Sequence, residues 1–173
     1  MIYLDNNGTT AVAPEVLEAM LPYLQHHYGN PSTRSPLGQQ ARRGLDQARQ
    51  QVAEFLGCEG DEVVFTSGAT ESNNWVLQAT AADWRGQGLP HFITSQVEHP
   101  SVGRTLDFLE HQGRAEVTRL AVDSWGRINP EDVQAALRPN TVLVTLMHSN
   151  NEVGTLQPVS EVARALEGRV LLH

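Results

Sequence analysis

Short apolar runs rich in Val, Ile, Leu and Thr alternate along most of the chain with longer segments in which apolar positions recur every three or four residues. The short runs predict strands at residues 62–66, 91–95, 116–120, 141–147 and 169–172. The longer segments predict helices near residues 69–85, 101–112, 130–137 and 158–166. This alternation is typical of βα units that feed a mostly parallel sheet. We therefore expect an α/β fold with helices on both faces of the sheet.

Two helices are expected before this block. Residues 14–23 predict a short helix, and an apolar stripe predicts a long amphipathic one that ends at Gly57. The stripe consists of Leu37, Ala41, Leu45, Ala48, Val52 and Phe55. At 173 residues and without an evident linker, the chain is expected to form one domain, with residues 1–36 as an N-terminal helix and loop segment.

The composition narrows the classes of function. A net charge of −8 argues against nucleic-acid binding, which usually relies on clustered Lys and Arg. No apolar stretch approaches the roughly 20 residues that span a bilayer, and the start of the chain lacks the features of a signal peptide. The single cysteine, Cys58, excludes an internal disulfide and agrees with a reducing compartment. We therefore expect a cytoplasmic protein that binds neither nucleic acid nor membrane.

The segment TSGATESNN, residues 66–74, joins an apolar run to a predicted helix. A helix start offers unpaired N–H groups and the positive end of the helix dipole, and a glycine turn lets an anion approach them. Thr66, Ser67 and Thr70 add hydroxyl donors, so the segment could hold a phosphate. A hydroxyl-rich N-cap with a tight turn explains the same residues equally well. The segment matches neither a Walker loop nor a dinucleotide fingerprint.

Two further loops follow predicted strands. His99 comes after the strand expected at 91–95, and His148, Asn150 and Asn151 come after the strand expected at 141–147. Taken singly, a loop histidine is usually a surface residue, and paired asparagines before a glycine usually form a turn. Together with the turn at 66–70, the loops place a phosphate-type turn, an imidazole and carboxamides at one edge of the sheet. That arrangement indicates a ligand site.

Five ordered motifs, spread over almost the whole chain, carry a family resemblance. They are YLDNNGTT (3–10), GNPS (29–32), VVFTSGATESNN (63–74), VEHPSV (97–102) and MHSNNEVGTLQP (147–158). With them the chain resembles the N-terminal part of a cysteine desulfurase, in the class V aminotransferase group of fold-type I pyridoxal phosphate (PLP) enzymes. The resemblance implies part of a large PLP-dependent transferase domain, without the C-terminal small domain.

The resemblance also implies roles for single residues. The backbone of Ala69 and the backbone and hydroxyl of Thr70 would bind the phosphate of PLP. His99 would stack on the pyridine ring and could transfer protons. Asn151, rather than Asn150, would bind the phenolic oxygen. No metal ligands are expected.

The implied reaction converts L-cysteine to L-alanine and passes the sulfur on as an enzyme persulfide, for iron–sulfur cluster biosynthesis or another acceptor. The implied partners are L-cysteine, a second copy in a homodimer or a complementing C-terminal half, and a sulfur-acceptor or scaffold protein.

One departure from the family is chemical. All 12 basic residues are arginines, so these residues include no lysine to form the Schiff base with PLP, and arginine cannot replace it. Cys58 matches no catalytic position, and the persulfide cysteine of the family would come after residue 173. The sequence is compatible with three interpretations of the chain. The chain is a piece of a desulfurase that is inactive without its complement, a lysine-free binding or scaffold protein with the same fold, or an unrelated α/β domain that binds another phosphorylated small molecule.

Overall fold

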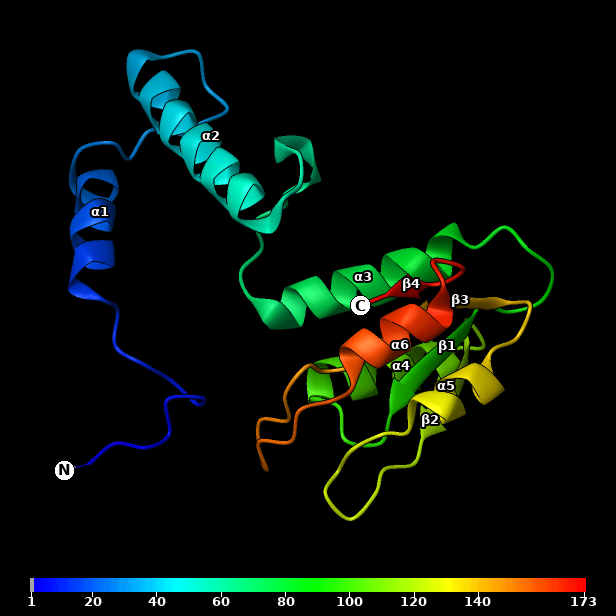
Figure 1. Cartoon of the computed structure of the whole chain (residues 1–173). Helices are drawn as coiled ribbons and strands as arrows, with labels where there is room; N and C mark the ends of the chain where they lie inside the picture. Colours follow the sequence, from blue (N-terminus) through cyan, green and yellow to red (C-terminus); the bar gives the residue numbers. More distant parts are fainter. Residues whose placement is uncertain (1) are drawn as a thin grey trace. The chain divides into compact units, whose positions relative to one another are not determined.

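The computed structural model of the protein describes residues 2–173, which divide into two compact units, up to Phe65 and from Thr66 onward (Figure 1). The first unit is helical, with α1 (Pro14–Gln25), α2 (Pro36–Leu56) and the short 3-10 helix η1 (Gly60–Glu62). α2 begins where Ser35 Oγ accepts the N–H of Gly38 at 3.1 Å, and it ends at Gly57 in the left-handed conformation. Both predicted N-terminal helices are confirmed.

The strand expected at residues 62–66 does not form. Glu62 ends η1, and residues 63–66 belong to no strand. A strand exists only through hydrogen bonds to a neighbouring strand, and the carbonyl of Val63 accepts instead from the Arg49 guanidinium group. Val64 and Phe65 remain 58% and 46% exposed. The apolar pattern was therefore misleading here, because it carries no information about a partner strand.

The second unit contains a four-stranded parallel sheet in the order β2-β1-β3-β4. Its strands are β1 (His91–Ser95), β2 (Glu116–Leu120), β3 (Thr141–Val144) and β4 (Leu171–Leu172). The predictions for β1 and β2 are confirmed residue for residue, whereas β3 and β4 are shorter than expected. The hydrogen bonding between β3 and β4 continues past their ends, since the N–H of Leu146 donates to the carbonyl of His173 at 2.9 Å.

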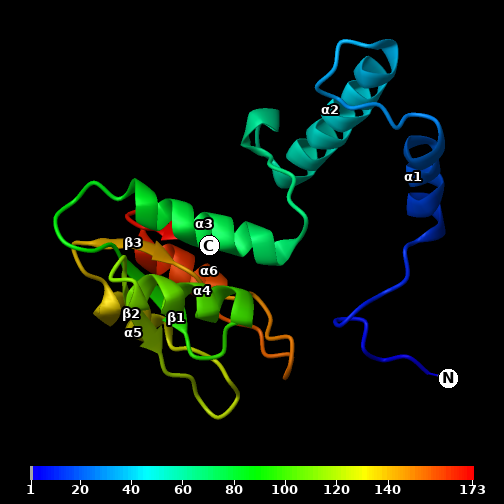
Figure 2. The same cartoon turned by 180° about the vertical axis from the view of Figure 1, so that it is seen from behind.

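Helices cover both faces of this sheet, as predicted. α3 (Ala69–Asp83) and α4 (Pro100–His111) pack on one face, and α5 (Pro130–Ala136) and α6 (Val159–Leu166) pack on the other. α6 lies in front of the sheet in Figure 1, and α4 lies in front of it in Figure 2. Adjacent residues of β1 point to opposite faces of the sheet. Phe92 packs with α3 and α4 on one face, and Ile93 packs with α5 and α6 on the other. No helix within residues 2–173 is long and apolar enough to cross a membrane.

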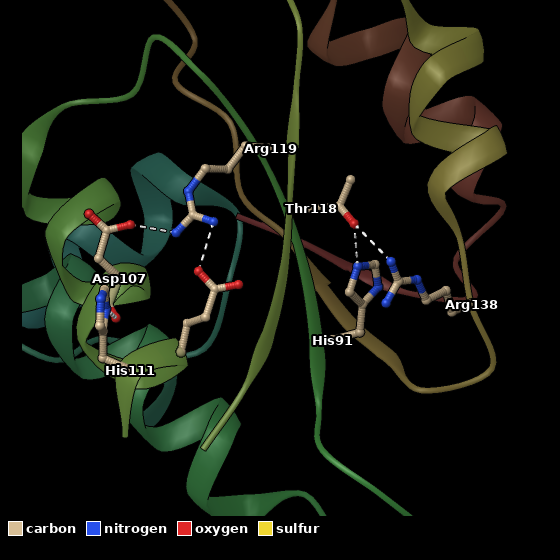
Figure 3. Close-up of polar contacts among 7 residues, drawn as sticks. His91, Asp107, His111, Thr118, Arg119 and Arg138 are labelled. Carbon is tan, nitrogen blue, oxygen red and sulfur yellow. Dashed lines mark hydrogen bonds and ion pairs between the residues drawn. The ribbon is translucent and has the colours of Figure 1, made fainter. Parts of the chain in front are cut away.

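A polar cluster around His91, the first residue of β1, links three strands, and Figure 3 shows the part of it that His91, Thr118 and Arg138 form. The side chain of His91 is fully buried, with Nδ1 2.8 Å from Thr141 Oγ1 and Nε2 2.8 Å from Thr118 Oγ1. Arg138 pairs with Glu116 at 2.8 Å beside this cluster. Burial lowers the pKa of His91, with a further contribution from the Arg138 charge. The cluster stabilises the edge of the sheet opposite to the loops that carry His99 and Asn151.

Candidate functional site

The strand order creates a crevice at the carboxyl ends of β1 and β3. From β1 the chain passes through α4 to β2, whereas β3 lies on the other side of β1 and is reached through α5, on the opposite face. The loops that leave β1 and β3 therefore diverge, and such a switch point is the usual ligand site of open α/β sheets. The first loop leads to His99, and the second contains Asn150 and Asn151.

The hydroxyl groups before α3 build the turn itself. Thr66 Oγ1 lies 2.8 Å from Ser72 Oγ. The Oγ and the N–H of Ser67 both donate to Glu71 Oε2, at 2.6 and 2.7 Å. The side-chain hydrogen bond from Ser67, together with the backbone one, lowers the pKa of the Glu71 carboxyl. These hydrogen bonds hold the turn in shape and do not involve the N–H groups of Ala69 and Thr70.

The first turn of α3 is open to a ligand. Within the described chain, no acceptor binds the N–H groups of Ala69 and Thr70, and Gly68 caps the helix without a side-chain bond. Gly68 has φ 157° and ψ 177°, a combination that is essentially restricted to glycine, and a Cβ there would meet no atom within 4 Å. Free donors and open space therefore coincide at the positive end of α3, where anions bind.

His99 is the N-cap of α4, and it is tied to α3. Its Nδ1 accepts the N–H of Ser101 at 3.1 Å and lies 2.8 Å from Ser101 Oγ. Asn73 Nδ2, on α3, donates to the same Oγ at 2.8 Å. This contact brings the start of α4 next to the start of α3.

Thr70 and His99 consequently line the same cavity, whose volume is about 410 Å³. The remaining lining residues are Asn74, Gln78, Pro100, Ser101, Arg104, Thr105 and Phe108. Ala69 precedes Thr70 in the same helical turn but does not line the cavity, and neither does Asn151. The structure thus brings together two of the four residues that the family resemblance implied.

The two asparagines of the second loop differ in burial. Asn150 is 7% exposed, its Nδ2 donates to the carbonyl of Val97, and its Oδ1 accepts the N–H groups of Glu152 and Val153. The side chain of Asn150 is therefore occupied in holding the loop against the end of β1. Asn151 is exposed and donates to Glu152 Oε1 at 3.0 Å. The assignment of a ligand contact to Asn151 rather than Asn150 agrees with this difference but stays a prediction.

Glu98 is a residue that sequence reasoning missed. Its carboxylate accepts from Ser95 Oγ at 2.6 Å and from the N–H of Met147, at 3.1 Å to Oε1 and 3.0 Å to Oε2. Burial raises its pKa although these hydrogen bonds favour the charged form. Glu98 therefore connects the loop after β1 to the end of β3. Its only sequence signal was a carboxylate next to His99 in a loop that follows a buried strand.

The chemistry of these residues fits a phosphorylated pyridine such as PLP. The N–H groups of the first turn and the Thr70 hydroxyl can receive a phosphate, and the flat imidazole of His99 can face an aromatic ring. Arg104 adds a positive charge to the wall of the cavity. Neither lysine nor cysteine lines the cavity, and residues 2–173 contain no group of His, Cys, Asp and Glu that could hold a metal ion. The groups that line the cavity thus fit such a ligand, and none of them is an amine that could form a Schiff base with it.

Known proteins are similar to this chain in sequence and in fold. A model of the family described as Aminotransferase class-V matches residues 2–173. The cysteine desulfurase IscS of Methanosarcina thermophila is 43% identical over 173 residues, which are 99% of this chain and 42% of that protein. Two solved structures, a NifS-like protein and SspA in complex with cysteine, match 99% of the chain with TM-scores of 0.93 and 0.91, each at 38% identity.

The chain spans less than half the length of these relatives, 42% of IscS and 47% and 49% of the two solved chains. The family resemblance that five motifs predicted is confirmed by a match that covers almost every residue. The chain belongs to the class-V aminotransferase family, and its relatives include cysteine desulfurases.

Proposed function

We propose that this chain is the cofactor-binding part of a PLP-dependent cysteine desulfurase, which converts L-cysteine to L-alanine and retains the sulfur as an enzyme persulfide. The observation that carries the proposal is the cavity between α3 and α4 that Thr70 and His99 share, beside the open N–H groups at the start of α3. The relative SspA was solved in complex with cysteine, which supports cysteine as the substrate class.

The residues of this chain would bind and orient the cofactor. The open N–H groups at the start of α3 and the hydroxyl of Thr70 would bind the phosphate, while His99 would face the ring and Asn151 would reach its phenolic oxygen. Bound PLP would act as the electron sink for the amino acid. The sequence contains no lysine, and Cys58 matches no catalytic position of the family. The amine and the thiol of the reaction would therefore have to come from outside these 173 residues.

Titration of the purified 173-residue chain with PLP tests the proposal. We expect noncovalent binding, visible as a change in PLP absorbance, that sodium borohydride does not convert into a covalent adduct because no lysine is present. Thr70→Val should weaken binding about tenfold, since hydrogen bonds to charged groups contribute roughly 1.5–3 kcal/mol. Thr80→Val is the matched control, because Thr80 lies on the same helix but not in the cavity.

Equal affinities of the Thr70→Val and Thr80→Val variants would contradict the proposal. So would strong binding of another phosphorylated compound by a chain that has no affinity for PLP.

The absence of lysine favours a second candidate, a noncatalytic binding or scaffold protein with the same fold. Expression of the complete gene separates the two functions. Covalent retention of PLP after borohydride treatment, together with alanine formation from cysteine, would support the desulfurase. Noncovalent binding without turnover would support the scaffold.

A further inference from the structure

Residues around His99 determine which of its ring nitrogens carries the proton. A neutral histidine has one N–H and one bare nitrogen, and its neighbours select between the two forms. Nδ1 of His99 lies 3.1 Å from the backbone N–H of Ser101, at the start of α4. A backbone N–H can only donate, so Nδ1 must accept and must be the bare nitrogen. The proton of neutral His99 therefore resides on Nε2.

Ser101 supplies a second donor to the same nitrogen. Its Oγ lies 2.8 Å from His99 Nδ1, and Ser101 itself is 8% exposed. A serine hydroxyl has a single proton and two lone pairs, so its proton is favoured to point to Nδ1 when a neighbouring N–H donates to the oxygen. Asn73 meets this condition, because its Nδ2 donates to Ser101 Oγ at 2.8 Å. The order of donation is then Asn73 to Ser101 to His99.

We propose that Ser101 and Asn73 are positioning residues that hold the proton of neutral His99 on Nε2, the nitrogen left available to the cavity. No acceptor binds Nε2 among residues 2–173, and His99 lines the cavity. Nε2 of neutral His99 would therefore donate a hydrogen bond to a ligand in the cavity and could act as an acid, but not as a base. The inference rests on the proposed function for its catalytic meaning, but the location of the proton can be measured without any ligand.

Long-range ¹H–¹⁵N correlation spectra of the ¹⁵N-histidine-labelled protein, recorded above neutral pH without PLP, test the inference. A His99→Gln spectrum assigns the His99 signals. We expect the wild-type protein to show a bare Nδ1 and a protonated Nε2.

Asn73→Asp keeps the size of the side chain but replaces the donor with an acceptor, so the Ser101 hydroxyl should turn away from His99. Nδ1 would lose one donor, and the population with a proton on Nδ1 should rise about two- to tenfold, the factor that corresponds to one hydrogen bond. Ser101→Ala removes the same donor without adding charge and should act in the same direction. Ser101→Thr keeps a hydroxyl and should restore the wild-type signals.

Gln78→Glu is the charge-matched control, since Gln78 lies on the same helix and lines the same cavity without a bond to Ser101. A wild-type protein with the proton on Nδ1 would overturn the inference. So would Asn73→Asp and Ser101→Ala variants whose His99 signals match those of the control. A confirmed proton position in a protein that does not bind PLP would refute the proposed function and leave this inference intact.

Discussion

Asn150 and Asn151 are adjacent and chemically identical, but their surroundings give them different tasks. Asn150 is buried and uses both ends of its amide to hold the loop after β3, whereas Asn151 is exposed and donates to the neighbouring Glu152. Glu98 resembles Asn150 in this respect, since its carboxylate also connects the loop after β1 to the end of β3. Residue type alone therefore does not separate a structural side chain from one that is available to a ligand.

The two asparagines should respond differently to replacement by alanine. Asn150→Ala removes the hydrogen bonds that the buried Asn150 side chain makes with Val97, Glu152 and Val153, and should lower the free energy of unfolding by about 1–3 kcal/mol. Asn151→Ala should change it by about 0.5 kcal/mol or less, as is usual for exposed positions, but should weaken PLP binding. Urea denaturation and PLP titration of both variants provide the measurements. Equal losses of stability would contradict the assignment of separate tasks.

At the scale of elements, the starts of α3 and α4 define the site. Both helices begin without an acidic N-cap, and the hydrogen bond between Asn73 and Ser101 links their N-terminal parts. The sheet places these starts at the carboxyl end of β1, next to the switch point between β1 and β3. The strand predicted at 62–66, which would have led into this turn, is missing because residues 63–66 have no partner strand in the described chain.

Two glycines at the starts of these helices should have opposite effects when replaced by alanine. Gly68→Ala forces a side chain into a conformation that only glycine adopts readily, and should cost about 1–3 kcal/mol of stability and distort the turn before α3. Gly103 lies inside α4, where an added Cβ meets no atom within 4 Å. Gly103→Ala should therefore stabilise the protein by about 0.5–1 kcal/mol. Thermal unfolding measures both changes. A stabilising Gly68→Ala would contradict the geometry of the turn.

At the scale of the whole molecule, the two units differ in the amount of apolar surface that they bury. Among the described residues up to Phe65, the buried hydrophobic side chains are Ala53 and Val63, whereas the second unit has two clusters on the two faces of its sheet. Because burial of apolar surface is the main source of stability, the units should open at different free energies.

Hydrogen exchange should therefore be faster in the first unit of the 173-residue chain. We expect the amides of α2 to exchange well before those of β1 and α4, since Phe92 and Leu106 are fully buried and α2 buries only Gly38 and Ala53. Exchange followed by mass spectrometry of peptides measures the difference. Similar protection in α2 and α4 would contradict it.

The His91 cluster should make the stability of the second unit depend on pH. Burial holds the pKa of His91 below 6.5 in the folded protein, while the unfolded chain takes up its proton near 6.5. As the pH falls below 6.5, only the unfolded state binds this proton, so the free energy of unfolding should decrease until the folded pKa is reached. The groups that face His91 are Thr118 and Glu116 on β2, Thr141 on β3 and Arg138 after α5.

A His91→Asn variant should lose much of this pH dependence. His173 contributes in the same direction, because burial lowers its pKa as well, and a His111→Asn variant serves as the control because His111 is exposed. Urea denaturation between pH 5 and pH 7, roughly the range around the unfolded pKa, provides the test. An unchanged slope in His91→Asn would contradict the assignment to this residue.

Periodicity in the sequence by itself determined the helices, two of the strands and the presence of helices on both faces, because these depend on local spacing of apolar residues. Motif order determined the family. Only the tertiary structure decided the order β2-β1-β3-β4, the link from Glu98 to Met147 across 49 residues, and the contact of Asn73 with His99 through Ser101. These features depend on pairings between distant segments, and a local pattern does not state which segments meet.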